Sequence, residues 1–134
     1  MNLSSEDREK LIALALKARQ QAYAPYSHYA VGAALITRSG RIFSGCNIEN
    51  AAYPTTICAE RVAVFSAVAE GERDIAAIVV ATSNGGSPCG SCRQVLAEFG
   101  LGTQVICVDA AGQVLLETDL NSLLPGAFTP RDLA

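Results

Sequence analysis

Two short cysteine-containing runs constrain the fold of this chain more strongly than any other feature. The first is Cys58-Ala59-Glu60, and the second is Pro88-Cys89-Gly90-Ser91-Cys92. Three thiolate ligands with a vacant fourth position are typical of a catalytic zinc site, and a carboxylate two residues from a ligand can handle the protons of an attacking water. The fold must therefore bring the two runs together. We predict that Cys58, Cys89 and Cys92 bind one Zn²⁺ per chain, with Glu60 as the catalytic carboxylate.

The composition favours one folded domain, residues 1–134, that acts on a small ligand. Half of the residues are hydrophobic and 17% are charged, so a core can form and some apolar surface is expected to pack against other subunits. The net charge of −3 and the absence of a basic run disfavour a nucleic-acid partner. No apolar stretch approaches the roughly 20 residues of a membrane span.

The cellular compartment is expected to be the cytoplasm. The first seven residues lack the basic and apolar regions of a signal peptide. Five cysteines leave at least one thiol unpaired in any disulfide scheme, which favours a reducing environment.

The hydrophobic pattern predicts an alternation of helices and strands. Helices are expected at residues 5–23, 57–70, 89–99 and 119–123, and strands at residues 29–36, 41–46, 75–82, 104–109 and 113–117. The continuous apolar run at 75–82 indicates a central strand buried on both faces. This order predicts an α/β fold, a three-layer α-β-α sandwich around one five-stranded mixed sheet.

Caps and apolar stripes refine the expected helices. The first helix should be capped by Ser4 or Ser5, and the second by Thr55 or Thr56. The last helix should be capped by Asp119. The first helix has an apolar stripe of Leu11, Leu14, Ala15 and Ala18, and the second is expected to bury Val62, Phe65 and Val68 or Ala69.

Both cysteine runs fall at expected helix starts. Cys58 lies in the first turn of the second helix, while Cys89 and Cys92 lie in the first turn of the third, where a spacing of three places them on one face. A helix N-terminus carries partial positive charge and lowers the pKa of a nearby thiol. Two such termini would therefore hold the three thiolates together.

A cationic side chain is expected beside the thiolates, because Zn²⁺ with three thiolates carries a net negative charge. Arg61 directly follows Glu60, and we expect its guanidinium to bond the thiolates of Cys58 and Cys89. Arg93 is a second candidate. His28, the only histidine, is expected to make structural hydrogen bonds and not to bind the metal.

Other interpretations of the cysteines remain open at this point. Cys46 or Cys107 could complete a structural Cys₄ zinc site, although both fall in expected strands and resemble small buried hydrophobic residues. A redox dithiol of the thioredoxin type would leave Cys58 and Glu60 without a role.

Taken together, these runs resemble the small homotetrameric cytidine deaminases, a zinc-dependent family of the cytidine and deoxycytidylate deaminase superfamily. The two cysteine runs, extended through Arg61 and Gln94, match the metal motifs of the whole superfamily. Three other segments resemble motifs of the small family: residues 25–34, residues 45–54, and Leu123-Leu124-Pro125 with Phe128. The likeness covers almost the whole chain.

The resemblance implies hydrolytic deamination of cytidine and 2′-deoxycytidine to uridine and 2′-deoxyuridine, with release of ammonia, in pyrimidine salvage. It implies that Glu60 shuttles protons. It also implies that Asn47 and Glu49 bind the sugar 3′-hydroxyl and that the backbone at Ala59 meets the pyrimidine. A solvated loop is the plainer interpretation of Asn47 and Glu49.

The resemblance further implies a homotetramer with active sites shared between subunits. Tyr53 would reach the sugar, and Phe128 the base, of a neighbouring subunit; the plainer role of Phe128 is a C-terminal core anchor. Tyr29 would contact the base through its aromatic ring. The family usually has Phe-Pro where this chain has Tyr29-Ala30, so the aromatic ring is kept but a hydroxyl is added that needs a partner.

Three alternative functions are compatible with the motifs. The first is deamination of another cytosine compound, such as an aminonucleoside antibiotic or a nucleotide; the Asn47 and Glu49 pair favours plain nucleosides, and a cationic phosphate-binding cluster is missing. The second is a non-catalytic structural zinc module. The third is a nucleic-acid editor, which the negative net charge disfavours.

Overall fold

One mixed sheet of five strands organises the chain. The computed structural model describes residues 3–133. The strands are β1 (Gly32–Thr37), β2 (Ile42–Cys46), β3 (Ile75–Ala81), β4 (Gln104–Val108) and β5 (Val114–Asp119), in the spatial order β2-β1-β3-β4-β5. The β3–β4 pair is parallel and the other three neighbouring pairs are antiparallel, which confirms the predicted mixed sheet.

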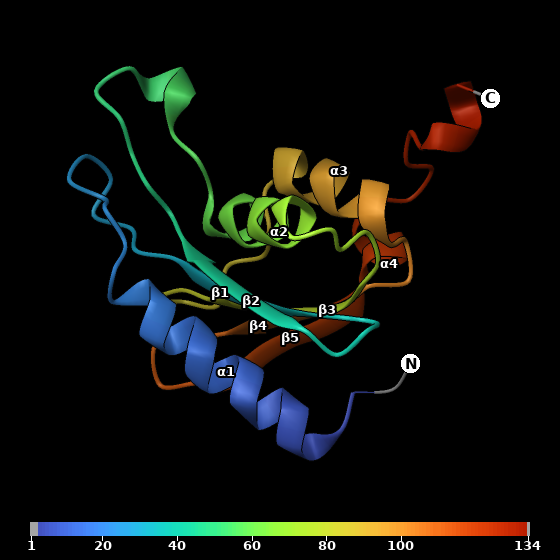
Figure 1. Cartoon of the computed structure of the whole chain (residues 1–134). Helices are drawn as coiled ribbons and strands as arrows, with labels where there is room; N and C mark the ends of the chain where they lie inside the picture. Colours follow the sequence, from blue (N-terminus) through green and yellow to red (C-terminus); the bar gives the residue numbers. More distant parts are fainter. Residues whose placement is uncertain (1–2, 134) are drawn as a thin grey trace.

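Helices cover both faces of this sheet (Figure 1). α1 (Ser5–Arg19) lies on one face, and α2 (Ala59–Ala69) and α3 (Gly90–Phe99) lie on the other, with the short α4 (Leu120–Leu123) beside α3. Two 3₁₀ turns, η1 (Tyr53–Thr55) and η2 (Pro130–Leu133), lie in segments that project from the α2 and α3 side. The predicted three-layer sandwich is therefore confirmed.

The central strand β3 is buried along its whole length, as its apolar sequence predicts. Two hydrophobic clusters flank the sheet. Leu35, Ile78 and Val80 pack with α2 and α3, while Ala34, Val79 and Ile106 pack with α1. The strand period of two sends alternate side chains to each cluster.

α1 begins where the sequence predicts, but it ends earlier. The Ser4 side chain accepts a hydrogen bond from the Asp7 N–H at 3.0 Å, and Leu11 and Ala15 are fully buried. The helix stops at Arg19 because the backbone further on pairs elsewhere: the Tyr23 N–H donates to the Asn47 carbonyl, and Tyr23 bridges Ile48. The expected extension to residue 23 is wrong for this reason.

Two glycines permit the close approach of helices to the sheet. A Cβ at Gly32 would lie 2.0 Å from the Ala15 carbonyl oxygen of α1, and a Cβ at Gly45 would lie 2.7 Å from the Ala63 nitrogen of α2. Both neighbours are backbone atoms, so the helices sit directly on the strands at these points.

α2 buries a different face from the one expected. Its buried residues include Ala63, Val64 and Ala67, whereas Phe65 is 47% exposed. Small residues four apart form the stripe that can lie against Gly45, and bulky side chains would hold the helix away from the sheet. The expected caps are also wrong, because Cys58 takes the N-cap position and makes no side-chain cap bond.

The last helix is capped as predicted. The Asp119 carboxylate accepts a hydrogen bond from the Ser122 N–H at 2.8 Å, which satisfies an orphan donor of the first turn of α4. Within residues 3–133, no helix combines the length and the hydropathy that a membrane crossing requires.

Candidate metal centre and active site

Three cysteine sulfurs meet where α2 and α3 begin. Cys58 and Cys89 are the N-cap residues of these two helices, and Cys92 lies in the first turn of α3. The Sγ atoms of Cys58 and Cys89 are 3.9 Å apart, those of Cys89 and Cys92 are 3.5 Å apart, and all three lie within 4.8 Å of one another. The structure thus brings together the three predicted ligands.

Backbone contacts fix the two helix starts. Ile57, just before Cys58, pairs with Ile48 through two N–H···O bonds of 3.0 Å. Before Cys89, the Arg93 guanidinium donates to the Pro88 carbonyl at 2.8 Å and to the Ser87 hydroxyl at 3.0 Å. It also donates to the Leu123 carbonyl at 2.8 Å. Arg93 therefore holds the loop in place and does not contact a thiol as its second-candidate role required.

The two remaining cysteines stand apart from this cluster. In the described part of the chain, the only group of three or more candidate ligand side chains is Cys58, Cys89 and Cys92. Cys107 is fully buried in β4, and burial raises its pKa to about 11; burial also raises the pKa of Cys46. A Cys₄ site has no fourth thiol in this geometry. A simple dithiol leaves the clustered third sulfur unexplained.

Arg61 supplies the expected cation. Its Nη2 donates to the Cys58 Sγ at 3.3 Å, but no bond to Cys89 is formed, so that half of the expectation is wrong. Hydrogen bonding with the Cys92 thiol, followed by the Arg61 guanidinium, lowers the pKa of Cys58 to about 5 despite burial. This shift favours the thiolate form of Cys58.

Glu60 is a buried carboxyl at the same helix start. It is 5% exposed, and this burial raises its pKa to about 7; the nearby Cys58 thiolate adds to the rise. A carboxyl poised near neutral pH can both accept and return a proton.

The donor set fits a zinc ion. Three thiols converge within bonding range of a common centre, and two of them lie at helix N-termini, which favour negative charge. The Nε of Arg61 is buried without a hydrogen-bond partner among the described residues. The guanidinium charge therefore remains next to the thiols and is not neutralised by a carboxylate of residues 3–133. Chemically the site is an anionic, three-ligand, sulfur-rich centre with one adjacent cation.

A cavity of about 280 Å³ opens beside this centre. It is lined by two of the clustered cysteines, the buried carboxyl and three predicted substrate contacts, together with residues that the sequence did not single out. In chain order these are Ser27, Tyr29, Val31, Asn47, Glu49, Thr56, Ile57, Cys58, Glu60, Val80, Thr82, Gly86, Ser87 and Cys89.

Asn47 is buried and organises the cavity wall. Its Oδ1 accepts from the Val31 N–H at 2.9 Å, and its Nδ2 donates to the Tyr29 carbonyl at 2.8 Å. These side-chain bonds take the place of strand pairing, which is why β1 begins at Gly32 and not at residue 29 as expected. Asn47, 8% exposed, does not belong to a solvated loop.

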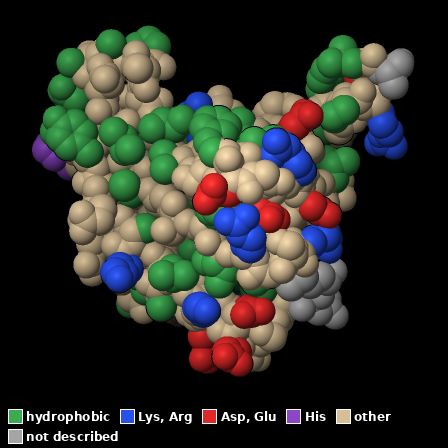
Figure 2. All heavy atoms as spheres, in the orientation of Figure 1, with side chains coloured by type: hydrophobic (Ala, Val, Ile, Leu, Met, Phe, Trp, Pro, Cys, Tyr) green, Lys and Arg blue, Asp and Glu red, His purple; other side chains and the backbone are tan. Residues whose placement is uncertain are grey.

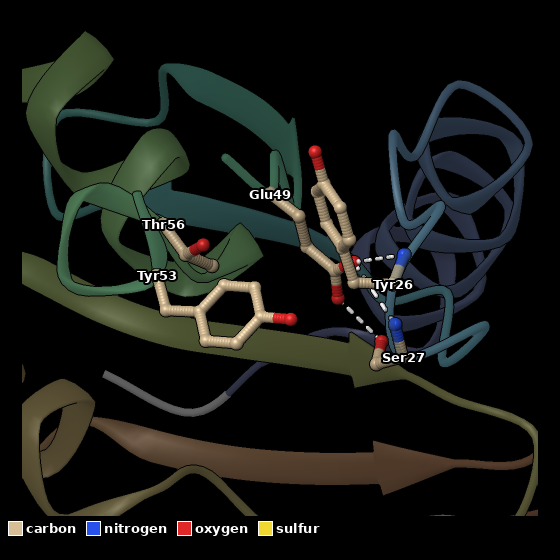
Figure 3. A pocket seen from close by; sticks show the side chains of 5 residues that line it. All are labelled: Tyr26, Ser27, Glu49, Tyr53 and Thr56. Atoms are coloured by element: carbon tan, nitrogen blue, oxygen red, sulfur yellow. Dashed lines mark hydrogen bonds between the residues drawn. The ribbon is translucent and has the colours of Figure 1, made fainter. Parts of the chain in front are cut away.

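Glu49 holds the neighbouring segment. Figure 3 shows its carboxylate directed at Tyr26 and Ser27. It accepts from the N–H groups of Tyr26 at 2.9 Å and Ser27 at 3.1 Å, and also from the Ser27 hydroxyl. The Ser27 hydroxyl bond is the main reason that the pKa of Glu49 lies below its usual value.

A second cavity of about 370 Å³ adjoins the first and shares Ser27, Glu49 and Thr56 with it (Figure 3). Tyr26 and Tyr53 complete its lining and meet edge to face, with ring centroids 5.7 Å apart. Tyr53 is 70% exposed. It faces this second cavity and is absent from the lining of the first.

Two other predicted contacts lie outside the lining of both cavities. Ala59 is fully buried as the first residue of α2. Phe128 is 57% exposed on the C-terminal segment, where its carbonyl accepts from the Gln94 side chain at 2.8 Å, so it is no core anchor. His28 adopts a left-handed φ of 59°, and its backbone N–H donates to the Ala24 carbonyl at 3.0 Å. Within residues 3–133, its imidazole is not part of the candidate metal cluster.

Sequence reasoning missed several cavity residues. Thr82 follows the buried strand β3, and Ser87 stands two positions before the predicted ligand Cys89. Their positions next to recognisable features were the only sequence signals for them. The sequence around Ser27 contains no signal that would identify it as a cavity residue. Its place depends on the contact with Glu49, which is distant in the sequence.

Comparisons with known proteins agree on one family. The model described as "Cytidine and deoxycytidylate deaminase zinc-binding region" matches residues 5–108. The cytidine deaminase of Sporosarcina psychrophila is 51% identical over 130 residues, which cover 96% of each chain. That of Halalkalibacterium halodurans is 48% identical over 130 residues, covering 95% of this chain and 98% of the relative.

Solved structures give the same result. The chain is similar to the crystal structure of cytidine deaminase from Burkholderia pseudomallei, with a TM-score of 0.85 and 46% identity over 94% of this chain and 100% of that one. For the cytidine deaminase of Mycobacterium tuberculosis the TM-score is 0.80 and the identity 37%, over 91% and 97% of the two chains.

Proposed function

The chain belongs to the zinc-dependent cytidine and deoxycytidylate deaminase family, and from that premise we propose that it deaminates cytidine and 2′-deoxycytidine to uridine and 2′-deoxyuridine, with release of ammonia. One observation carries the proposal. A single cavity is lined by Cys58 and Cys89, by the buried Glu60 and by the polar pair Asn47 and Glu49. Deamination of a nucleoside requires these elements in one place: a metal site, a proton carrier and hydrogen-bonding groups for the sugar.

Cys58, Cys89 and Cys92 would hold one zinc ion per chain. When bound, zinc supplies a Lewis acid that activates water for attack on a ring carbon bearing an amine. Arg61 stabilises the thiolate of Cys58 and offsets part of the negative charge of the three sulfurs.

Glu60 carries the protons of the reaction. Its burial keeps water away from the carboxyl and holds the pKa near 7, so the group can take a proton from the attacking water. It returns this proton to the ring nitrogen N3, then takes the second proton of the added water, from the hydroxyl at C4, and delivers it to the departing amine. Such positioned proton transfer contributes about 10²- to 10⁴-fold to a rate.

Asn47 and Glu49 position the sugar. Each uses its side chain to hold the segment from Tyr26 to Val31, and both still line the cavity, where an amide and a carboxylate can bind the 3′-hydroxyl. The ring of Tyr29 forms a flat wall for the base. The backbone at Ala59, which stands between the lining residues Cys58 and Glu60, would meet the pyrimidine at the edge of the cavity.

The active form is a homotetramer with sites shared between subunits. Two lines support this proposal: the exposed aromatic residues Tyr53 and Phe128, and the two projections that carry them, on which hydrophobic side chains gather (Figure 2). Tyr53 would approach the sugar, and Phe128 the base, in a neighbouring subunit.

The wider setting is also part of the proposal. Residues 1–134 act as one catalytic domain in the cytoplasm, in pyrimidine salvage, with a nucleoside as ligand and neither nucleic acid nor membrane as partner. The net charge of −3 is consistent with this choice.

Ammonia release from cytidine by the purified protein, with zinc measured on the same sample, tests the proposal. Turnover is expected with about one zinc per chain. Zinc without turnover of cytidine or 2′-deoxycytidine would overturn it in favour of another cytosine compound or a structural site. For the structural alternative, Cys46→Ser and Cys107→Ser should both keep full zinc if neither is a ligand.

A further inference from the structure

The hydroxyl of Tyr29 has a partner that lies behind the cavity wall. It donates to the Asn84 Oδ1 at 2.7 Å, while the Tyr29 side chain lines the cavity beside the clustered cysteines. Asn84 is not among the cavity-lining residues and has no part in the proposed chemistry.

Asn84 bonds two residues of the wall directly and is linked to a third through Thr82. Thr82 Oγ1 also donates to the Asn84 Oδ1, at 3.3 Å, and the Gly86 N–H donates to Thr82 Oγ1 at 2.9 Å. Tyr29, Thr82 and Gly86 all line the cavity. Asn84 is anchored in turn by an antiparallel bridge to Asp109, at the end of β4.

The tyrosine and the loop are also in steric contact. A Cβ at Gly86 would lie 2.6 Å from the Tyr29 hydroxyl oxygen, so this oxygen occupies the space above the glycine. The segment before β1 and the loop between β3 and α3 are therefore fixed against each other at the hydroxyl.

The same loop leads into the metal centre. Ser87 and Pro88 follow Gly86 directly, and the next residue is the ligand Cys89. A displacement of the loop would therefore move one ligand sulfur as well as one wall of the cavity.

We propose that Asn84 is a positioning residue that acts through the Tyr29 hydroxyl. It holds the aromatic wall and the loop before Cys89 in one arrangement, and so sets both the fit of the pyrimidine base and the hold on the zinc ion. The first consequence rests on the proposed function, and the second does not.

The test compares Tyr29→Phe, Asn84→Ala and the double variant with wild type. Asn84→Asp keeps an oxygen acceptor and serves as the conservative rescue. Tyr23→Phe removes the hydroxyl of an exposed tyrosine that lines neither cavity, and it serves as the matched control. The measurements are KM and kcat for cytidine, the rate of zinc release to a chromogenic chelator, and the midpoint of thermal unfolding.

Each single variant is expected to raise KM about 3- to 10-fold with kcat within about twofold, as the loss of one net hydrogen bond implies. Each should release zinc faster. The double variant should be no worse than the worse single one, because both changes break the same bond. Asn84→Asp and Tyr23→Phe should match wild type.

Wild-type KM and zinc release in Tyr29→Phe would overturn the inference, as would a double variant equal to the product of the single effects. A lowered unfolding midpoint with unchanged KM and zinc release would show a structural role only, and would also overturn it. If wild type does not deaminate cytidine, the proposed function fails. The zinc-release rates then decide the inference by themselves.

Discussion

Arg61 shows how one side chain tunes a sulfur centre. Within residues 3–133 it is the cation that donates to a thiol of the three-cysteine cluster, at 3.3 Å from Cys58, and its guanidinium is partly buried. A positive charge at this place favours the thiolate, and the thiolate is the form that binds zinc.

Replacing Arg61 with Gln should weaken zinc retention. The pKa of Cys58, held at about 5 in part by Arg61, should rise, so protons should displace zinc at a higher pH than in wild type. Zinc content after dialysis across a pH series measures this shift, and turnover should fall in parallel.

Arg73→Gln is the matched control, because Arg73 bonds backbone carbonyls at the far end of α2. It should retain zinc like wild type. Identical zinc-loss curves for Arg61→Gln and wild type would contradict the role assigned to Arg61.

Asn47 bonds the backbone before β1 and, as proposed, also binds the sugar, and the two roles can be measured separately. Asn47→Ala leaves the Val31 N–H and the Tyr29 carbonyl unpaired, which should cost about 2–3 kcal/mol of unfolding free energy in addition to activity. Urea unfolding at fixed zinc concentration measures the loss. Asn121→Ala, at an exposed position of α4, should change stability little; an equally stable Asn47→Ala would show that the two bonds do not hold the segment.

At the scale of elements, close backbone contact holds the helices on the sheet. Gly32→Ala would place a methyl 2.0 Å from the Ala15 carbonyl oxygen, and neither backbone can yield without moving α1. We expect a loss of about 3 kcal/mol or more in unfolding free energy, at the upper end of overpacking effects.

Gly102→Ala is the control, since nothing lies within 4 Å of a Cβ there. Urea unfolding of both variants makes the comparison. A Gly32→Ala protein as stable as Gly102→Ala would contradict the packing of α1 described above.

The elements also show what a sequence can and cannot predict. Local patterns sufficed for the buried strand β3, for the cap at Asp119 and for cysteines at two helix starts. Local patterns gave wrong boundaries or wrong buried faces where a residue distant in the sequence determines the structure. β1 starts late because Asn47 bonds the backbone before it, and α2 turns its alanines inward because Gly45 lies beneath them.

The site follows the same rule. The clustering of the three sulfurs, with Glu60 beside them, was predictable because all four residues belong to short motifs. The hydrogen bond from the Tyr29 hydroxyl to Asn84 was not predictable, because it joins segments that only the folded sheet brings together.

At the scale of the whole molecule, exposed apolar side chains point to assembly. Phe65 on α2 is 47% exposed, Tyr53 is 70% exposed, and Phe128 is 57% exposed. Surfaces of this kind are commonly covered by identical subunits.

As the proposed homotetramer, the purified protein should have about four times the 14.0 kDa mass of one chain. Phe65→Asp places a charge on the exposed apolar face of α2 and should shift the protein toward smaller species with reduced turnover. Light scattering coupled to gel filtration measures the mass. Ala13→Asp, on the exposed side of α1, should leave it unchanged; a monomeric wild type that is fully active would contradict the shared site.

The role of Glu60 in deamination is decided by the rate of uridine formation from cytidine by Glu60→Gln and wild type, on samples of known zinc content. Gln has nearly the same shape as Glu but cannot accept the proton. We expect Glu60→Gln to keep its zinc and to lose at least about 100-fold in kcat/KM. A zinc-loaded Glu60→Gln protein that keeps more than about a tenth of wild-type turnover would contradict this role.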